Sequence, residues 1–270
     1  MREPMNMPVT SLENVMDVKG KNVIVTGGNS GIGWGICRAF AQRGANVAIL
    51  GIEVEDGINA AKELEAYGGK YFFVECDITN MKMVKDAVEK VYAEFEKVDI
   101  LVNNAGVTAV IPFLDMDEEL TDWHKVINVN LNGTVNMTYA VGNKMRADGN
   151  GGLIINISSI GGETCGNSLE QPMDGYISSK AALNHLTKAL AIQFAQYNIR
   201  VNAIMPGRTT SRLDALHTPE YMAKHAGKQL TRRQGEGLEI GALCIFIASA
   251  EGAHLDGIVV PHDGGTLCLY

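Results

Sequence analysis

The sequence has few cysteines and no long apolar run, and each shortage argues against a class of protein. The five cysteines are odd in number, lie far apart and never form a C-x-x-C pair, so neither a disulfide framework nor a zinc or redox dithiol motif is expected. No apolar run approaches the roughly 18 residues of a membrane span, and the first residues lack the pattern of a secretory signal. We therefore expect reduced cysteines in a cytoplasmic protein.

Positive charge is also scarce. The chain holds 23 Lys and Arg against 31 Asp and Glu, and the positive residues are scattered rather than gathered into a tail or stripe. Nucleic acid and membranes are therefore not expected as partners. With 270 residues, 46% of them apolar, the chain is long enough to bury one sizeable core, which predicts a single folded domain.

Short β-branched runs alternate with longer helical stretches along the whole chain. The expected strands are 22–26, 46–50, 71–75, 99–103, 152–157, 200–204 and 257–260. The expected helices are 31–43, 53–67, 81–96, 118–147, 174–197 and 236–250. This alternation is typical of βαβ units, and most strands are apolar on both faces. It predicts an α/β fold with a seven-stranded parallel sheet.

Two segments depart from the alternation. Residues 1–17, with a capping-box pattern at Thr10 and Glu13, precede a domain over 18–270 and are expected to form either an arm ending in a short helix or a mobile terminus. The second segment, about 208–234, follows the sixth strand. Open α/β sheets bind ligands beyond the carboxyl ends of their strands, so this segment is predicted to be a substrate loop.

A glycine-rich stretch, TGGNSGIG, follows the first strand and places Gly27, Gly31 and Gly33 at a turn that opens a helix. Glycines let a backbone approach a pyrophosphate, and the helix amino terminus supplies N–H donors. The spacing G-x-x-x-G-x-G departs from the widespread G-x-G-x-x-G. Alone, it is compatible with a dinucleotide site or with a tight structural turn.

Further patterns follow TGGNSGIG in this order: Asp77, NNAG over 103–106, Asn130, Ser159 and Tyr176-x-x-x-Lys180. With this combination the chain resembles the short-chain dehydrogenase/reductase family over about residues 19–265. The resemblance implies a Rossmann-type doubly wound fold and hydride transfer between a nicotinamide dinucleotide and an alcohol or ketone. The pattern is also similar to bacterial NAD(H)-dependent hydroxysteroid dehydrogenases.

The resemblance also implies where the dinucleotide would bind. The glycine turn would border the pyrophosphate, the residues after the third strand would meet the adenine, and those after the sixth would meet the nicotinamide. The expected cofactor-binding residues are Gly27, Asn29, Ser30, Ile32, Gly33, Gly51, Ile52, Asp77, Ile78, Asn104, Ala105, Gly106, Tyr176, Lys180, Pro206, Gly207 and Thr209.

The end of the second strand should decide which dinucleotide is used, because a carboxylate there favours the free 2′-hydroxyl and an arginine favours a 2′-phosphate. If Gly51 occupies the deciding position, the usual acid is missing. The basic residues expected at Ser30 or Ile52 for a phosphate are missing too, and Glu53 is close enough to repel one. NAD(H) is therefore expected over NADP(H), and the group that holds the ribose stays open.

Catalysis is expected from Tyr176 and Lys180, which at i and i+4 share one helical face. The ordinary pKa of tyrosine is about 10, so acid/base work near neutral pH requires a lower pKa. Lys180 and the oxidised nicotinamide ring are the two cations that could lower it. In the family this lysine also holds the nicotinamide ribose.

Ser159 and Asn130 complete the expected catalytic set. Ser159 ends its strand, where its hydroxyl can reach a substrate oxygen; the rival Ser158 should point the opposite way. By resemblance, Asn130 bends its helix and holds a water in the proton relay. The neighbouring Asn128 and Asn132 are expected to be surface or structural residues.

Other chemistries find little support. The six histidines form no H-x-x-x-H pair and no close pair with cysteine, so no metal site is expected. A serine hydrolase is also disfavoured, because the chain has no G-x-S-x-G elbow.

The substrate pocket is expected between the stretch from Ser159 to Tyr176 and the loop 208–234. Apolar residues of that loop suit a bulky ring: Leu213, Leu216, Tyr221 and Met222. Its basic residues, Arg208 among them, would bind a carboxylate or coat a solvated lid. A hydroxysteroid or similar hydrophobic alcohol is the leading hypothesis. The alternatives are a sugar acid or polyol, a β-ketoacyl group, and a dinucleotide-binding sensor or scaffold without turnover.

By family resemblance we also expect a homotetramer, formed through the long helices 118–147 and 174–197 and the carboxyl-terminal strand.

Overall fold

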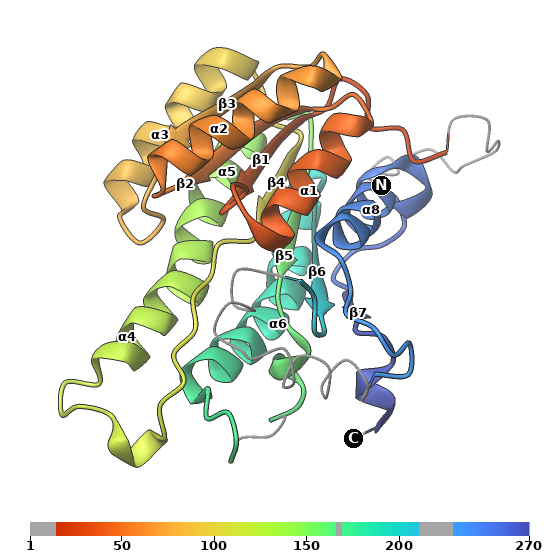
Figure 1. Cartoon of the computed structure of the whole chain (residues 1–270). Helices are drawn as coiled ribbons and strands as arrows, with labels where there is room; N and C mark the ends of the chain where they lie inside the picture. Colours follow the sequence, from red (N-terminus) through yellow and green to blue (C-terminus); the bar gives the residue numbers. More distant parts are fainter. Residues whose placement is uncertain (1–14, 166–168, 211–228, 270) are drawn as a thin grey trace.

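The computed structural model describes residues 15–165, 169–210 and 229–269 (Figure 1). Within these residues seven strands form one sheet, in the order β3-β2-β1-β4-β5-β6-β7, and all neighbouring pairs are parallel. The strands are β1 (Asn22–Thr26), β2 (Asn46–Gly51), β3 (Tyr71–Glu75), β4 (Ile100–Asn103), β5 (Gly152–Ile157), β6 (Ile199–Pro206) and β7 (Val259–His262). The predicted Rossmann-type, doubly wound parallel sheet in a single domain is confirmed.

Helices cover both faces of the sheet (Figure 1). One face carries α1 (Gly31–Gln42), α2 (Val54–Leu64) and α8 (Gly237–Ala248). The other carries α3 (Met81–Phe95), α5 (Thr134–Asp148) and α6 (Asp174–Phe194). The short helix α4 (Thr121–Ile127) leads through a π-helical turn, Asn128–Gly133, into α5. Single 3-10 turns occur at Glu65–Tyr67, Phe113–Asp115, Ile160–Gly162, Ala195–Tyr197, Ala250–Gly252 and Thr266–Leu269. No helix in the described part of the chain is both long and apolar enough to cross a membrane.

Most elements differ from their expected bounds by one to three residues at an end, and two of these differences have a clear structural cause. The last strand was expected to begin at residue 257, but Gly257 has φ +68°, outside the β region, and the strand begins at Val259. The helix expected over 118–147 begins at Thr121 and contains the π-helical turn. That turn keeps the helix continuous, because the residues on both sides of it remain helical.

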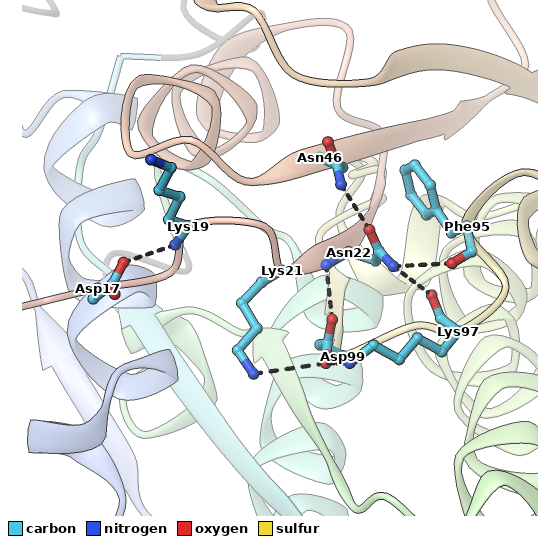
Figure 2. Close-up of polar contacts among 8 residues, drawn as sticks. All are labelled: Asp17, Lys19, Lys21, Asn22, Asn46, Phe95, Lys97 and Asp99. Carbon is cyan, nitrogen blue, oxygen red and sulfur yellow. Dashed lines mark hydrogen bonds and ion pairs between the residues drawn. The ribbon is translucent and has the colours of Figure 1, made fainter.

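Side-chain hydrogen bonds centred on Asn22 close the amino-terminal edge of the sheet (Figure 2). Its Nδ2 donates to the carbonyl oxygens of Phe95 (3.1 Å) and Lys97 (3.0 Å), and its Oδ1 accepts from Asn46 (2.9 Å). Asp99 accepts from the Asn22 backbone N–H (2.9 Å) and pairs with Lys97 (2.9 Å). These bonds tie β1 to β2 and to the turn before β4, and the opposite, carboxyl edge carries the cavity described below.

Some predicted features lie outside the described residues. They include residues 1–14 of the expected arm, with Thr10 and Glu13, and the apolar side chains Leu213, Leu216, Tyr221 and Met222 of the expected substrate loop.

Candidate active site

A cavity of about 890 Å³ lies at the carboxyl edge of the sheet, where the strand order reverses between β1 and β4. Its volume falls within the range of small-molecule and cofactor sites. Every residue expected to bind the cofactor lines it, and so does Ser159. Of the expected catalytic residues, Asn130 lies behind the cavity wall instead.

The turn after β1 lines the cavity with glycine backbone that carries no side chains. Gly27 has φ +62°, in the left-handed region that favours glycine, and a Cβ on Gly33 would fall on the Gly27 carbonyl oxygen. Ser30 is the N-cap residue of α1, but its side chain makes no capping hydrogen bond with the described residues. The first N–H groups of α1 therefore have no capping side chain, which suits a pyrophosphate.

The loop after β4 is tied to the end of β1. The backbone N–H groups of Asn104 and Ala105 donate to Thr26 Oγ1 at 3.0 and 3.1 Å. Asn104 Nδ2 donates to the carbonyl oxygens of Thr26 and Gly27, both at 3.0 Å. These bonds hold Asn104 and Ala105 beside the glycine turn.

The loop after β3 forms the wall expected to meet the adenine. Asp77 Oδ1 accepts hydrogen bonds from the Thr79 backbone N–H (2.9 Å) and Oγ1 (2.7 Å), so this carboxylate is turned into its own loop. Ile78 is buried beneath the cavity, so close to Gly133 that a Cβ there would lie 2.6 Å from Ile78 Cγ1. The cavity wall is therefore apolar at Ile78, and the close contact with Gly133 supports this side chain from behind.

Three of the expected catalytic side chains meet at the cavity. Tyr176 and Lys180 lie one turn apart on α6, and Lys180 Nζ is 5.6 Å from the centroid of the Tyr176 ring. The Ser159 side chain, just beyond β5, forms a hydrogen bond with Tyr176. Ser158 is buried, and its Oγ donates to the Lys180 carbonyl oxygen (3.2 Å). The structure thus places Ser159, rather than Ser158, beside the tyrosine.

Burial shifts the pKa of both ionisable groups. Lys180 is 4% exposed and its Nζ donates to the Ile157 carbonyl oxygen (2.8 Å). This burial lowers the pKa of Lys180 to about 8. The pKa of Tyr176 is raised, contrary to the lowering expected from Lys180, because desolvation outweighs the hydrogen bond with Ser159.

Asn130 lies on the π-helical turn and is fully buried. Its Oδ1 accepts from the Val107 N–H (2.8 Å), and its Nδ2 donates to the Val107 carbonyl oxygen (2.9 Å) and to Ser179 Oγ (3.1 Å). Ser179 Oγ in turn donates to the Tyr176 carbonyl oxygen (2.7 Å). The side chain of Asn130 therefore connects the loop after β4 to the turn of α6 that carries the tyrosine.

Sequence reasoning missed several cavity residues. Asn128, expected to be surface or structural, lines the cavity and accepts a hydrogen bond from Asn132 (2.8 Å). Thr266, beyond the carboxyl end of β7, and Gln229, within the expected substrate loop, also line it. The strand pattern could have located Thr266, because β7 ends at the same edge as the other strands. No spacing or motif marks Gln229.

No disulfide joins the five cysteines. Two of them line the cavity, the exposed Cys165 and the buried Cys76. In the portion of the chain that the structure describes, no group of three His, Cys, Asp or Glu side chains is placed to hold a metal ion.

Comparison with known proteins decides the family. A family profile described as short chain dehydrogenase matches residues 21–221. The chain belongs to the short-chain dehydrogenase/reductase family. Members of this family are oxidoreductases that bind a nicotinamide dinucleotide and act on CH–OH groups of small molecules.

Individual relatives span nearly the whole of this short-chain dehydrogenase/reductase. Oxidoreductase UcpA of Salmonella typhimurium is 39% identical over 258 residues, which cover 92% of this chain and 94% of UcpA. The 3-oxoacyl-(acyl-carrier-protein) reductase FabG of Thermotoga maritima is 37% identical over 251 residues, which cover 93% and 99%. A solved 7α-hydroxysteroid dehydrogenase, complexed with NADH and 7-oxo glycochenodeoxycholic acid, is similar with a TM-score of 0.86 and 32% identity over 93% of this chain and 95% of that one.

The site of this short-chain dehydrogenase/reductase fits a nicotinamide dinucleotide. The glycine turn leaves no room for a Cβ at Gly33, the amino end of α1 has no capping side chain, and both features border the same cavity. Tyr176 and Lys180 stand at the same cavity.

Proposed function

We propose that the protein transfers a hydride between NAD(H) and a secondary alcohol or ketone, with Tyr176 as general acid and base. The observation that carries this proposal is the meeting of Ser159, Tyr176 and Lys180 at the cavity that the glycine turn also borders. A dinucleotide-binding sensor would need the cavity but not these three side chains.

Tyr176, Ser159 and Lys180 each have a separate role in ketone reduction. The Tyr176 hydroxyl gives its proton to the carbonyl oxygen while the carbonyl carbon receives a hydride, and the carbonyl π electrons form the new O–H bond. Ser159 donates a hydrogen bond to the same oxygen as negative charge develops on it. The Lys180 ammonium stabilises the phenolate that remains on Tyr176. The bound cofactor supplies the hydride when reduced and accepts it when oxidised, and in alcohol oxidation the proton moves to Tyr176.

As substrate we propose a hydroxysteroid or similar hydrophobic alcohol. Apolar side chains near Tyr176 and Ser159 in the chain line the cavity, namely Ile160, Met173 and Ile177. The similar 7α-hydroxysteroid dehydrogenase, solved with NADH and a 7-oxo bile acid, supports the same choice of substrate and cofactor.

A second candidate is the reduction of a β-ketoacyl group, favoured by the 37% identity with FabG. A carrier-bound substrate would need a mouth wide enough for a pantetheine arm. The cavity also contains Arg208 and Gln229, which would suit a sugar acid, so both classes belong in the substrate panel.

The test follows the loss of reduced-nicotinamide absorbance with NADH and with NADPH over ketosteroids, keto sugar acids and a β-ketoacyl thioester. We expect turnover of a ketosteroid with NADH. Tyr176→Phe should lower kcat by on the order of 10² to 10⁴ while the protein still binds the dinucleotide, because the proton donor is lost and the other cofactor-binding residues remain. Tyr67→Phe, at a tyrosine that is 39% exposed on the surface, is the matched control and should change neither.

The other possible outcomes distinguish between the candidate functions. Unchanged activity in Tyr176→Phe would contradict the mechanism. Turnover of the thioester alone would favour the second candidate, and dinucleotide binding without turnover of any substrate would favour a sensor.

A further inference from the structure

The second strand ends without a charged side chain at the cavity. Gly51, the last residue of β2, lines the cavity and pairs with Glu75 of β3. Ile52 follows it and is 62% exposed. Neither residue can accept a hydrogen bond from a ribose hydroxyl through its side chain or attract a phosphate.

The carboxylate of Glu53 approaches the place that a side chain of residue 51 would occupy. A Cβ built on Gly51 would lie 3.8 Å from Glu53 Oε2 and 3.4 Å from Asn29 Oδ1. Asn29 belongs to the glycine turn, and its Nδ2 donates to Glu53 Oε2 at 3.5 Å. Both residues line the cavity. The space above Gly51 is therefore bordered by a carboxylate and an amide.

Acidic side chains gather at the amino end of α2. Glu53 is the N-cap residue of α2, and its side chain makes no capping hydrogen bond with that helix. Glu55 and Asp56 follow in the first turn of α2. Of these three carboxylates, Glu53 lines the cavity while Glu55 and Asp56 do not, so Glu53 is the one that faces a phosphate bound there.

We propose that Glu53, positioned by Asn29, accepts the hydrogen bond of the adenosine 2′-hydroxyl and repels a 2′-phosphate. It does so from two residues beyond the position where the acid of a second strand ordinarily stands. This assignment rests on the proposed NAD(H)-dependent function, and it makes Glu53 the residue that decides between the two dinucleotides.

The test measures the dissociation constants of NADH and NADPH by fluorescence titration, with no substrate present. Glu53→Gln should weaken NADH binding about tenfold, because a hydrogen bond to a charged acceptor is replaced by one to a neutral amide. It should strengthen NADPH binding, because the repulsion is removed. Glu55→Gln removes a neighbouring charge from the same turn of α2 and should change each constant less than twofold.

A rescue variant distinguishes the loss of a direct contact between the carboxylate and the ribose from a general loss of folding. The space at Gly51 admits a side chain, because a Cβ there meets neighbours only at ordinary contact distances of 3.4 to 3.8 Å. Gly51→Asp combined with Glu53→Gln should therefore restore the preference for NADH. The melting temperature of each variant shows whether the fold is kept.

Failure of the role proposed for Glu53 can be distinguished from failure of the proposed function. A wild-type protein that binds neither dinucleotide would contradict the proposed function. A wild-type preference for NADH that Glu53→Gln leaves unchanged would overturn the role of Glu53 alone, and so would an equal effect of Glu55→Gln. A wild-type preference for NADPH would overturn the role of Glu53 and the choice of NAD(H), while hydride transfer itself would stand.

Discussion

Lys180 is held in a setting that makes its charge depend on pH near the physiological range. It is buried, one of its N–H groups is bound by the Ile157 carbonyl, and its pKa falls to about 8. The ammonium is therefore present below about pH 8 and is lost above it. Tyr176, whose pKa is raised, keeps its proton over the same range.

These two shifts predict opposite pH dependence for the two directions of the reaction. Ketone reduction needs the phenol of Tyr176 and the ammonium of Lys180, so its kcat/KM should fall as the pH rises through about 8. Alcohol oxidation needs the phenolate and should rise with pH. Rates measured in both directions from pH 6 to 10 would check this, and a reduction rate that stays level above pH 8 would contradict it.

The site residues whose positions could be predicted are those for which spacing in the sequence fixes the relative orientation of the side chains. Tyr176 and Lys180 at i and i+4 had to share a helical face, and strand alternation separates Ser158 from Ser159. The position of Glu53 could not be predicted, because it depends on how one side chain folds back over Gly51. The raised pKa of Tyr176 could not be predicted either, because desolvation depends on everything packed around the ring.

Among the helices, α1 and α8 approach each other very closely. A Cβ on Gly35 of α1 would fall on the backbone of Gly237, and one on Gly241 of α8 would lie 2.5 Å from the Ala39 Cβ. Glycine at these positions therefore allows the two helices to pack backbone against backbone. Since α1 also presents its amino end to the cavity, this contact positions the glycine turn.

Gly35→Ala tests that contact, because helix propensity and packing predict opposite signs. Alanine in place of glycine inside a helix should stabilise the protein by about 1 kcal/mol. Overpacking against Gly237 should instead destabilise it, by about 1 to 3 kcal/mol. We expect the second effect to be larger, with lower stability in denaturant unfolding and weaker NADH binding. Equal or higher stability would show that the helices can separate freely.

The elements themselves could be predicted well, because alternating buried strands and amphipathic helices leave a strong pattern. The π-helical turn could not. Val126 before it and Met137, Val141 and Met145 after it are all buried, so the apolar pattern continues through the turn as in one ordinary helix.

For the whole molecule, we propose a homotetramer built through α5 and α6 and the carboxyl-terminal strand. Both helices carry apolar side chains on the surface of the single chain. Val135 is 41%, Tyr139 58% and Ile192 81% exposed. Burial of such side chains between subunits would be favourable.

Sedimentation should therefore give a mass four times the 29.1 kDa of one chain. Tyr139→Glu combined with Ile192→Glu should lower that mass without changing the helix content, because charges would be buried at the interface. Leu114→Glu, at a residue that is 94% exposed but outside these helices, is the matched control. A wild-type mass equal to one chain would contradict the proposed assembly.

The π-helical turn also makes the enzyme sensitive to a change in chain length. A π turn of this kind contains one residue more than the α-helical turn it replaces. Deleting one residue from Asn128–Gly133 would restore an ordinary helix and leave α4 and α5 in nearly the same orientation, because the extra residue is confined to the turn. The wider turn holds Asn130 where it bonds Val107 and Ser179, so this deletion should spare the core contacts of Val126 and Met137 but break that connection. A one-residue deletion within α5 would instead rotate part of the helix by about 100° and should be far more damaging.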